Sequence, residues 1–386
     1  MNARKIQWKY NLIQGLFWML FCITISFINS YLTDKGLSPD QIGIITATFG
    51  ALAALSQTIL GKLADTSKTI NWKNLIILLV VLRIISNIGL LIFEKPIISG
   101  LLFGFSLLLM NALIPFVNAA NFYYEKNGID LNYGVARGIG SLLFAVTSYS
   151  IGQLIPVMGI EIIVTAGFIV GVLMLIVTIS MPLNKTGNDV VLNSDTTTIT
   201  EGFFKKYPRF MLLLVGFTLL MIFHNSTSTY MLQILENVGG GNREVGTAFA
   251  IAAIFELPIM FGFVYLRKKI STHFMLVVAG IGFIVKASLY IIAPSVFMIY
   301  VAQAFQMLSF GLFASASVYC AQEEMDDNDK IKGQSLAASS ITIGSVFGNL
   351  SGGFIVNSFG SYANLVFGLA VVIVASLIII FAGKKK

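Results

Sequence analysis

Long apolar runs constrain this chain more than any other feature of its sequence. A helix needs about 20 apolar residues to cross the ~30 Å hydrocarbon core of a bilayer, so each run predicts one transmembrane helix. Only 11% of the residues are charged, against about 25% in soluble domains. We therefore expect an all-α membrane protein with twelve transmembrane helices. The expected spans are residues 10–32, 40–61, 74–93, 97–122, 133–156, 160–181, 209–233, 244–266, 273–293, 295–320, 332–356 and 361–382.

Lysine and arginine gather in alternate loops, which predicts how the helices are oriented. If the N-terminus is cytoplasmic, only Lys35, Lys95 and Arg243 fall in outer loops, and the other loop bases lie inside. Both termini are then cytoplasmic, in a multi-pass protein of the inner (cytoplasmic) membrane. The acidic segment 323–329 is a mild exception, because the rule counts bases and acids contribute little. The formal charge of +7 reports this orientation and does not suggest nucleic-acid binding.

One long hydrophilic segment divides the apolar runs into two sets of six. Residues 184–206 have no apolar period, which is typical of a linker, so we expect six-helix bundles at 1–183 and 207–386 joined by a cytoplasmic linker. A weak internal repeat supports this division, because Gly152-Gln153-Leu154 is similar to Gly348-Asn349-Leu350. Repeated halves that meet at a midplane cavity are the architecture of alternating-access carriers.

Several short motifs are similar, in order, to those of a known family of carriers. The stretches concerned are Tyr31–Gly43, Gly61–Asp65, Tyr133–Ser141, Gln306–Gly311, Gly333–Leu336 and Gly348–Gly353. Together they resemble the branch of the major facilitator superfamily that contains lactose permease, phenylpropionate permease and related proton-linked carriers. The resemblance covers nearly the whole chain. It implies two six-helix bundles and a secondary active transporter.

The segment Gly61–Asp65 resembles the superfamily signature between helices 2 and 3. Thr66 stands where that signature has a base, so its basic half is degenerate. A glycine permits close packing, and a carboxylate can satisfy a facing helix N-terminus. We expect Gly61 and Asp65 to brace helix ends during gating, although a short solvated loop would also fit this sequence.

Three bases, Arg83, Arg137 and Lys286, lie inside apolar runs. A charge at membrane depth costs about 2.5 to 3.5 kcal/mol even on insertion scales, so each base is a candidate functional residue. Arg83 lies on helix 3, which is usually peripheral in the family that the chain resembles. We therefore expect a structural pairing for Arg83, with a functional role as the alternative.

Arg137 and Asn118 are expected on the substrate path of the first bundle. Gly128 marks the turn between their helices, and nine or ten residues on either side of it rise about 14 Å, so the two side chains lie at the same height. In the permeases that the chain resembles, an acid three residues after a proline works with this arginine. Here Asn118 follows Pro115, so the acid is missing and an anionic or polyhydroxyl substrate is easier to accommodate. Arg137 as a purely structural tie between helix ends is the alternative.

Glu256 and Lys286 are the informative charges of the second bundle. Counted from the inner boundary at about 1.5 Å per residue, they lie about 16 and 20 Å deep, close enough in height to pair. Their places are similar to those of the acid and base that matter in lactose permease. We expect Glu256 to take up the coupled proton and Lys286 to contact substrate. A static salt bridge between two helices remains the alternative.

Other polar residues inside apolar runs add candidates to the list. His224 is a second proton-carrying candidate, because imidazole titrates near neutrality, although a hydrogen-bonded packing histidine fits equally well. Gln306 and Asn29 are expected substrate ligands. Gln303, Gln306 and Ser309 stand where lactose permease has its coupling histidine and acid nearby. The proton site of lactose permease is therefore not reproduced residue for residue.

The function expected from these features is proton symport of a small polar or organic-anion solute such as a sugar, a nucleoside or an aromatic acid. A proton-coupled exporter of amphipathic compounds and a non-transporting membrane sensor are the alternatives. The sequence holds no hydrolase, ATPase or metal-ligand motif, so we expect no enzyme activity, no cofactor and no metal. Cys22 and Cys320 fall in apolar runs and suggest no disulfide. The expected partners are substrate, protons and membrane lipids, without nucleic acid, for a monomeric protein.

Overall fold

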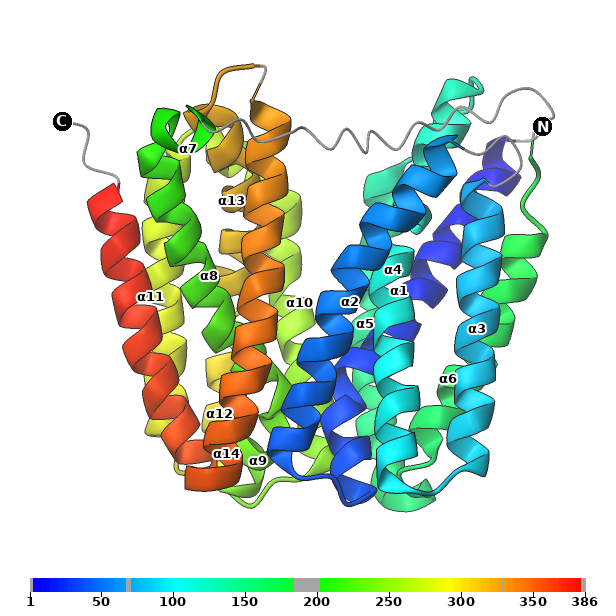
Figure 1. Ribbon diagram of the computed structural model, residues 1–386, viewed down its shortest axis with the longest axis horizontal. Helices are drawn as coiled ribbons and strands as arrows, with labels where there is room; N and C mark the ends of the chain where they lie inside the picture. The colour runs from blue at the N-terminus through cyan, green and yellow to red at the C-terminus, as the bar shows by residue number, and fades with distance from the viewer. Residues whose placement is uncertain (1–2, 67–70, 184–201, 328, 383–386) are drawn as a thin grey trace. The chain divides into compact units, whose positions relative to one another are not determined.

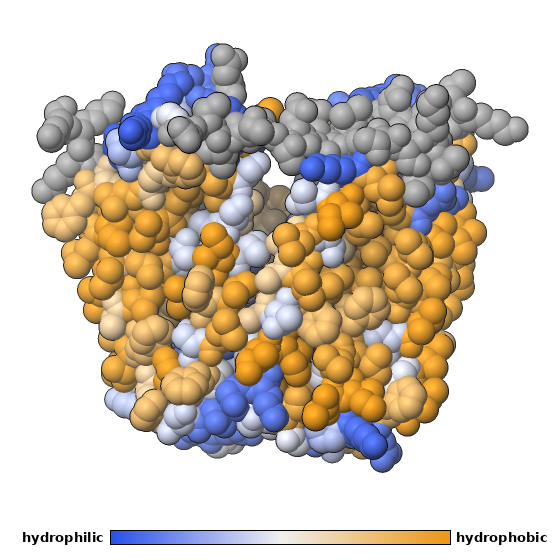
Figure 2. Space-filling view, in the orientation of Figure 1, coloured by the Kyte–Doolittle hydropathy of each residue, from blue (hydrophilic) through white to orange (hydrophobic). Residues whose placement is uncertain are grey.

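The computed structural model describes residues 3–66, 71–183, 202–327 and 329–382, and within these ranges every regular element is a helix. Eleven of the helices in the described part of the chain are long and apolar enough to cross a membrane. Figure 2 shows hydrophobic side chains over the middle of each unit, with hydrophilic ones toward both ends. An all-α fold is the consequence of a bilayer interior, where a helix satisfies its own backbone hydrogen bonds.

The chain groups into two compact units (Figure 1). Unit 1 contains Met1–Leu37 and Thr48–Asp195, and unit 2 contains Ser38–Ala47 and Thr196–Lys386. The division expected at 184–206 lies largely outside the described residues and stays a prediction. The short segment Ser38–Ala47, at the start of a helix that continues into unit 1, packs with unit 2.

Unit 1 is an all-helical bundle whose ends are held by polar caps. Its helices are α1 (Ala3–Asp34), most of α2 (Pro39–Thr66), α3 (Trp72–Ile92), α4 (Pro96–Lys126), α5 (Tyr133–Met158) and α6 (Ile162–Ile179). The last carbonyls of α6 accept hydrogen bonds from two lysines: Lys9 Nζ lies 2.6 Å from Ser180 O, and Lys73 Nζ lies 2.8 Å from Ile179 O. A cation suits the negative end of a helix dipole, so these bases also anchor α1 and α3 to α6.

Unit 2 contains more interrupted helices. They are α7 (Gly202–Lys206), α8 (Pro208–Thr229), α9 (Met231–Glu236), α10 (Asn242–Arg267), α11 (Thr272–Ile291), α12 (Val296–Ala304), the π-helix η1 (Met307–Gly311), α13 (Leu312–Glu324) and α14 (Lys330–Ala382). The expected span 295–320 is therefore one membrane-length segment that contains a π-turn. A π-turn inside a helix is uncommon and often marks a functional position.

Helix α14 is 53 residues long and bends at Gly360, whose φ of 84° and ψ of 167° are not helical. At 1.5 Å per residue a straight helix of this length would measure about 80 Å, far more than a bilayer. Gly360 separates the two runs that the sequence predicts as spans 332–356 and 361–382. Positive φ suits glycine, which has no Cβ to clash, so a tight turn is possible here without a loop.

The start of α2 is held by unit 2 through a tyrosine hydroxyl and two glycines. Tyr230 Oη lies 3.0 Å from Pro39 O and 3.0 Å from Asn349 O. A Cβ on Gly43 would lie 2.6 Å from Asn349 O, and one on Gly353 would lie 2.5 Å from Pro39 O. Only glycine permits so close an approach of two backbones. Pro39 and Gly43, in the first two turns of α2, therefore pack against α14 and the end of α8.

The segment Gly61–Asp65 is helical and is not a loop, because α2 continues through Thr66. Lys62, Leu63 and Ala64 favour helix, and one glycine costs only about 1 kcal/mol in a helix interior, so nothing in this segment stops α2 before Asp65. Gly61 is buried. The side chain of Asp65 lies outside the described residues, so the gating role expected for Gly61 and Asp65 stays a prediction.

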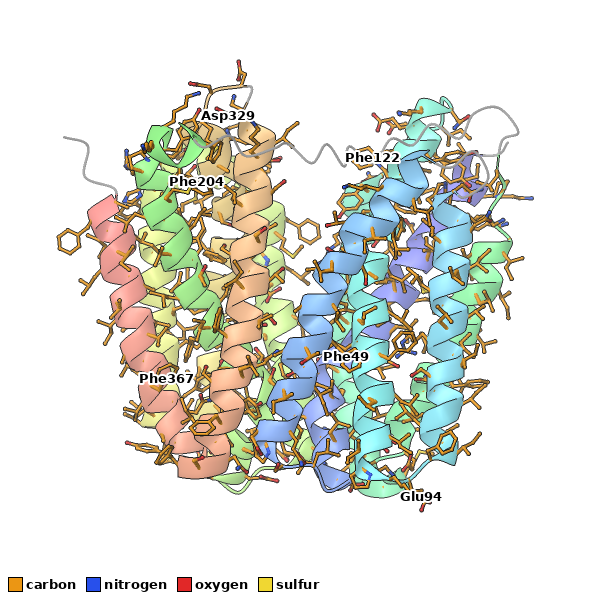
Figure 3. All side chains as sticks on the ribbon, in the orientation of Figure 1. Phe49, Glu94, Phe122, Phe204, Asp329 and Phe367 are labelled. Carbon is orange, nitrogen blue, oxygen red and sulfur yellow. The ribbon has the colours of Figure 1, made fainter. Side chains whose placement is uncertain are left out.

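The acidic segment between α13 and α14 is neutralised by bases at the same end of unit 2, where Figure 3 shows Asp329. Lys206 Nζ lies 2.7 Å from Asp326 and 2.9 Å from Asp329, and Tyr207 Oη donates to Asp329 at 2.9 Å. Hydrogen bonds from Lys206 and Tyr207 lower the pKa of the Asp329 carboxyl to about 2. This acidic segment is the exception to the excess of bases in the loops, and its acids are thus paired with those bases.

Candidate functional site

A chain of polar side chains in unit 1 connects α4, α1 and α5. Gln14 Nε2 lies 3.2 Å from Asn118 Oδ1, and Trp18 Nε1 donates to Gln14 Oε1 at 3.3 Å. The guanidinium carbon of Arg137 lies 3.8 Å from the centre of the Trp18 ring. Arg137 also donates to Ser141 Oγ at 2.5 Å. The structure therefore connects Arg137 and Asn118 by one series of side-chain contacts, which passes through Gln14 and Trp18 of α1.

A glycine makes the stacking of Arg137 on Trp18 possible. A Cβ on Gly140 would lie 2.3 Å from the Trp18 ring, so any larger residue would displace the indole. A guanidinium over an indole face is attracted by the ring's quadrupole, by about 0.5 to 2 kcal/mol depending on solvent exposure. Arg137 is half-buried, so its charge is held in a fixed orientation without being sealed from water.

Pro115 shapes the same region of unit 1 through the carbonyl that it leaves unpaired. Proline has no N–H, so the carbonyl of Asn111, four residues earlier, loses its helical partner. Gln57 Nε2 of α2 donates to Asn111 O at 2.7 Å and satisfies it. Helix α4 is thus bonded to α2 two turns before Asn118.

Asn29 is buried, and neither atom of its amide has a hydrogen-bond partner among the described residues. An unpaired amide in an apolar interior costs several kcal/mol. This cost makes Asn29 a position where water or a polar solute group would be stabilised. Its role as a substrate ligand stays a prediction.

A second polar chain, in unit 2, joins Lys286 to Glu256 through Gln306. Lys286 Nζ donates to Gln306 Oε1, and Gln306 Nε2 donates to Glu256 Oε1 at 2.8 Å. Lys286 and Gln306 are buried, with exposed fractions of 3% and 4%, and Glu256 is half-buried. The acid and the base that the sequence singles out are therefore linked by an amide, which accepts from the base and donates to the acid.

The π-turn η1 begins directly after Gln306 and lies against the two helices that carry the charges. A Cβ on Gly282 of α11 would lie 2.4 Å from Leu308 O of the turn, and one on Gly311 would lie 3.5 Å from Glu256 Cγ. The amide N–H of Gly311 donates to Gln306 O at 2.9 Å, which is the i to i+5 bond of a π-turn. Gln306 is thus placed by an irregular piece of helix between α10 and α11.

His224 lies in an aromatic contact within unit 2. Its ring stacks on Phe310 of the π-turn at 4.2 Å between centroids with an interplanar angle of 7°, and it meets Phe283 at 6.4 Å. Phe310 places His224 beside the turn that follows Gln306. The choice between a proton carrier and a packing histidine stays a prediction.

Arg83 is bonded to neutral acceptors of two other helices. Nη1 donates to Gly167 O of α6 at 3.1 Å, and Nη2 donates to Thr24 Oγ1 of α1 at 3.0 Å. Asn87, one turn along α3, accepts from Nη1 at 3.1 Å when its amide is turned. Among the described residues no carboxylate forms an ion pair with Arg83. This side chain therefore ties α1, α3 and α6 together.

Sequence reasoning missed Gln14, Trp18, Gln57 and Gly282. Gln14 and Gln57 were detectable, because a glutamine inside an apolar run is as informative as a charge. Trp18 and Gly282 carry no such signal, since aromatic residues and glycines are common in membrane helices. In the described part of the chain no group of three or more His, Cys, Asp or Glu side chains could hold a metal ion.

Comparisons with known proteins agree with this arrangement of helices. The family model described as the MFS_1 like family matches residues 8–367. A protein of Bacillus subtilis (strain 168), named "Uncharacterized transporter YwbF", is 25% identical over 394 residues, which cover 96% of this chain and 92% of that protein.

Two solved structures are similar in fold at low sequence identity. The nucleoside transporter NupG has a TM-score of 0.86 and 14% identity, with 100% of both chains covered. A bacterial homologue of the human lysosomal transporter Spinster, in an inward-facing and unoccupied conformation, has a TM-score of 0.70 and 15% identity, with 98% of this chain and 96% of that chain covered. Because the family model spans nearly the whole chain and its relatives are transporters, the protein belongs to the MFS_1 like family and is a membrane transporter of the major facilitator type.

Proposed function

We propose that this protein takes up a nucleoside, or another neutral solute that carries a ring and hydroxyl groups, together with a proton by alternating access. One observation carries the proposal: the buried chain from Lys286 through Gln306 to Glu256 joins a titratable acid to a base by an amide. An amide has both donors and an acceptor, so a solute that binds Gln306 competes with both charged partners. Solute binding and the charge of Glu256 are then linked.

The linked polar side chains of unit 1 favour a solute with a ring and hydroxyls over a bare anion. Arg137 is already stacked on Trp18, and Gln14, Asn118 and Ser141 supply neutral donors and acceptors next to it. Such groups match hydroxyls and the edge of a heterocycle. The similarity to a nucleoside transporter in fold supports this choice of probe, and sugars and aromatic acids are the other solutes to test.

The coupling step is a proton transfer to the Glu256 carboxylate. In the loaded state Glu256 carries the proton, and the solute takes over bonds of Gln306. After release of the solute, the proton leaves Glu256, and the chain to Lys286 forms again. Each proton moved inward contributes about 2.3 kcal/mol per 100 mV of membrane potential, which is enough to concentrate a solute. His224 is the candidate proton carrier if Glu256 is not.

The orientation that we propose has twelve crossings in two six-helix bundles and both termini in the cytoplasm. The two arms of α14 on either side of Gly360 count as separate crossings in this topology. The helix ends rich in lysine and arginine then face the cytoplasm of the inner membrane. We further propose that the protein works as a monomer and that Gly61 and Asp65 take part in gating.

The test is uptake by proteoliposomes with uridine as the first probe, followed by a sugar and an aromatic acid. Glu256→Gln imitates the protonated acid, so it should abolish proton-driven accumulation of uridine and keep exchange of uridine down its gradient. Glu236→Gln in α9 is the matched control, because Glu236 is an exposed glutamate of the same unit. The direction of the coupled flux separates import from export. Normal accumulation by Glu256→Gln would rule out Glu256 as the coupling site.

A further inference from the structure

The π-turn η1 is seated between two helices by glycine contacts on both sides. On the α11 side, a Cβ on Gly282 would lie 2.4 Å from Leu308 O, 2.7 Å from Leu308 C and 3.1 Å from Ser309 N. All three atoms belong to the backbone of the turn, which cannot move aside as a flexible side chain can. On the α10 side, Gly311 faces Glu256 at ordinary contact distance. Gly282 is therefore the tight contact of the pair.

Gly282 lies one helical turn before Lys286 on α11, and Leu308 lies two residues after Gln306. The spacing of four residues places Gly282 and Lys286 on the same face of α11, about 6 Å apart along its axis. The backbone contact at Gly282 therefore sets how close Lys286 comes to Gln306. An added Cβ would have to lie about 3.4 Å from Leu308 O instead of 2.4 Å, which would move the two helices about 1 Å apart. A shift of this size is larger than the whole range of hydrogen-bond lengths, about 2.7 to 3.2 Å.

The turn itself is closed by local bonds. Ser309 Oγ donates to Phe305 O at 2.8 Å, and the N–H of Ser309 donates to the same oxygen at 2.9 Å. Gln306 O accepts from Gly311 N at 2.9 Å. Return of the turn to a regular α-helix would rotate Gln306 by up to about 100°, the angle per residue, and would take its amide out of the chain.

We propose that Gly282 is a positioning residue: it seats the π-turn so that the amide of Gln306 joins Lys286 to Glu256. The inference rests on the proposed function, because it assumes that the linked side chains of Lys286, Gln306 and Glu256 couple proton and solute. The three atoms nearest to a Cβ on Gly282 belong to the backbone of the turn, not to Lys286 or Glu256. It acts through the backbone of the turn and through Gln306.

The experiment compares Gly282→Ala with Gly262→Ala, each alone and combined with Gln306→Ala. Gly262 is a helix glycine of the same unit with open space around its Cβ position, so both substitutions change helix propensity equally and only one meets backbone. Gly282→Ala should lower proton-driven uridine accumulation by about tenfold or more while exchange falls less than about threefold. In the Gln306→Ala background it should cause no further loss of accumulation. A loss that is as large in that background as in the wild type would overturn the proposal.

A second readout needs no solute and separates the inference from the proposed function. The thermal unfolding midpoint of the purified protein should fall less with Gly282→Ala in the Gln306→Ala background than in the wild type, because part of the cost is the broken amide bridge. Equal falls in both backgrounds would contradict positioning through Gln306. If Glu256→Gln keeps accumulation, Glu256 is not the coupling site, and this thermal comparison still decides the positioning.

Ser309→Ala covers the case in which Gly282→Ala does not fold. It removes the hydroxyl bond that closes the turn and inserts no atom between helices. We expect it to reduce accumulation more than exchange, and to have no effect on accumulation in the Gln306→Ala background. Equal reduction of accumulation and exchange would show that the turn has only a structural role. Gly311→Ala, with ordinary contacts to Glu256, should cause a smaller defect than Gly282→Ala.

Discussion

Arg83 in unit 1 and Lys286 in unit 2 are both buried bases, yet they are bonded in opposite ways. Their exposed fractions are 2% and 3%. The acceptors of Arg83 are Gly167 O and Thr24 Oγ1, which are neutral and have no proton to gain at physiological pH. Lys286 reaches a carboxylate, Glu256, through one amide.

The difference separates a structural cation from one that can take part in a cycle. A guanidinium bonded only to neutral oxygens has no titratable partner whose charge could change. An ammonium linked to a titratable acid changes its surroundings when that acid gains a proton. Burial alone therefore does not distinguish these two bases, and the chemistry of their acceptors does.

The largest effect on stability is expected for Arg83→Ala. Deleting this side chain leaves a cavity among α1, α3 and α6, which costs about 2 to 5 kcal/mol of the free energy of unfolding. The ratio of accumulation to exchange per folded molecule should not change. Thermal unfolding and transport of the same preparation check both statements, with exposed Lys95→Ala as the control. A stable Arg83→Ala protein that has lost accumulation would show that Arg83, like Lys286, takes part in transport.

The next effect is on transport and concerns Lys286→Met. Methionine has similar length but no donor, so Gln306 Oε1 loses its partner and the thermal unfolding midpoint should fall. Accumulation of uridine should fall by about tenfold or more, which corresponds to about 1.4 kcal/mol. Lys268→Met is the control, because Lys268 is an exposed lysine near the end of α10. Loss of stability without loss of accumulation would show that Lys286 has a structural role, as expected for Arg83.

Arg137→Lys tests a third cation, which is half-buried and stacked on a ring. Lysine keeps the charge and loses the planar fork that lies on Trp18, so affinity for uridine should fall by about tenfold. Direct binding to the purified protein measures it, and Arg243→Lys in an exposed position is the control. Unchanged affinity would leave Arg137 as a structural charge.

The smallest effect is expected for Asp329, an acid outside the membrane-length helices. The pKa of the Asp329 carboxyl is about 2, below its ordinary value of 3.8, so its bonds stabilise the folded protein above about pH 4 and this contribution is lost as the pH falls toward 2. Asp329→Asn should lower the thermal midpoint slightly at pH 6, and the difference from wild type should shrink at pH 3. Asp327→Asn, with a side chain 92% exposed, should show neither change. A difference that does not depend on pH would mean that packing, not charge, is lost.

The sequence correctly predicted that its long apolar runs form membrane-length helices, because a bilayer permits little else than helix. It also singled out Arg83, Arg137, Glu256 and Lys286, since charges in such runs are rare. It could not predict that Gln306 stands between Glu256 and Lys286, because height along a helix does not give the direction of a side chain. It also could not predict the π-turn, which has no known sequence pattern. The helix at Gly61–Asp65 depends on small differences in helix propensity, and the glycine in this segment obscures them.

One hydroxyl described above has a consequence for the start of α2. Tyr230 lies equally far, 3.0 Å, from two carbonyls, Pro39 O and Asn349 O, but a phenol has a single hydrogen to donate. At any moment one of the two oxygens is therefore without that bond, and rotation about one C–O bond transfers the hydrogen to the other. The junction has two nearly equivalent bonded arrangements, and a bond that is lost on the α2 side is at once available on the α14 side. Release of the first turn of α2 thus exchanges one hydrogen bond for another and leaves no donor unsatisfied.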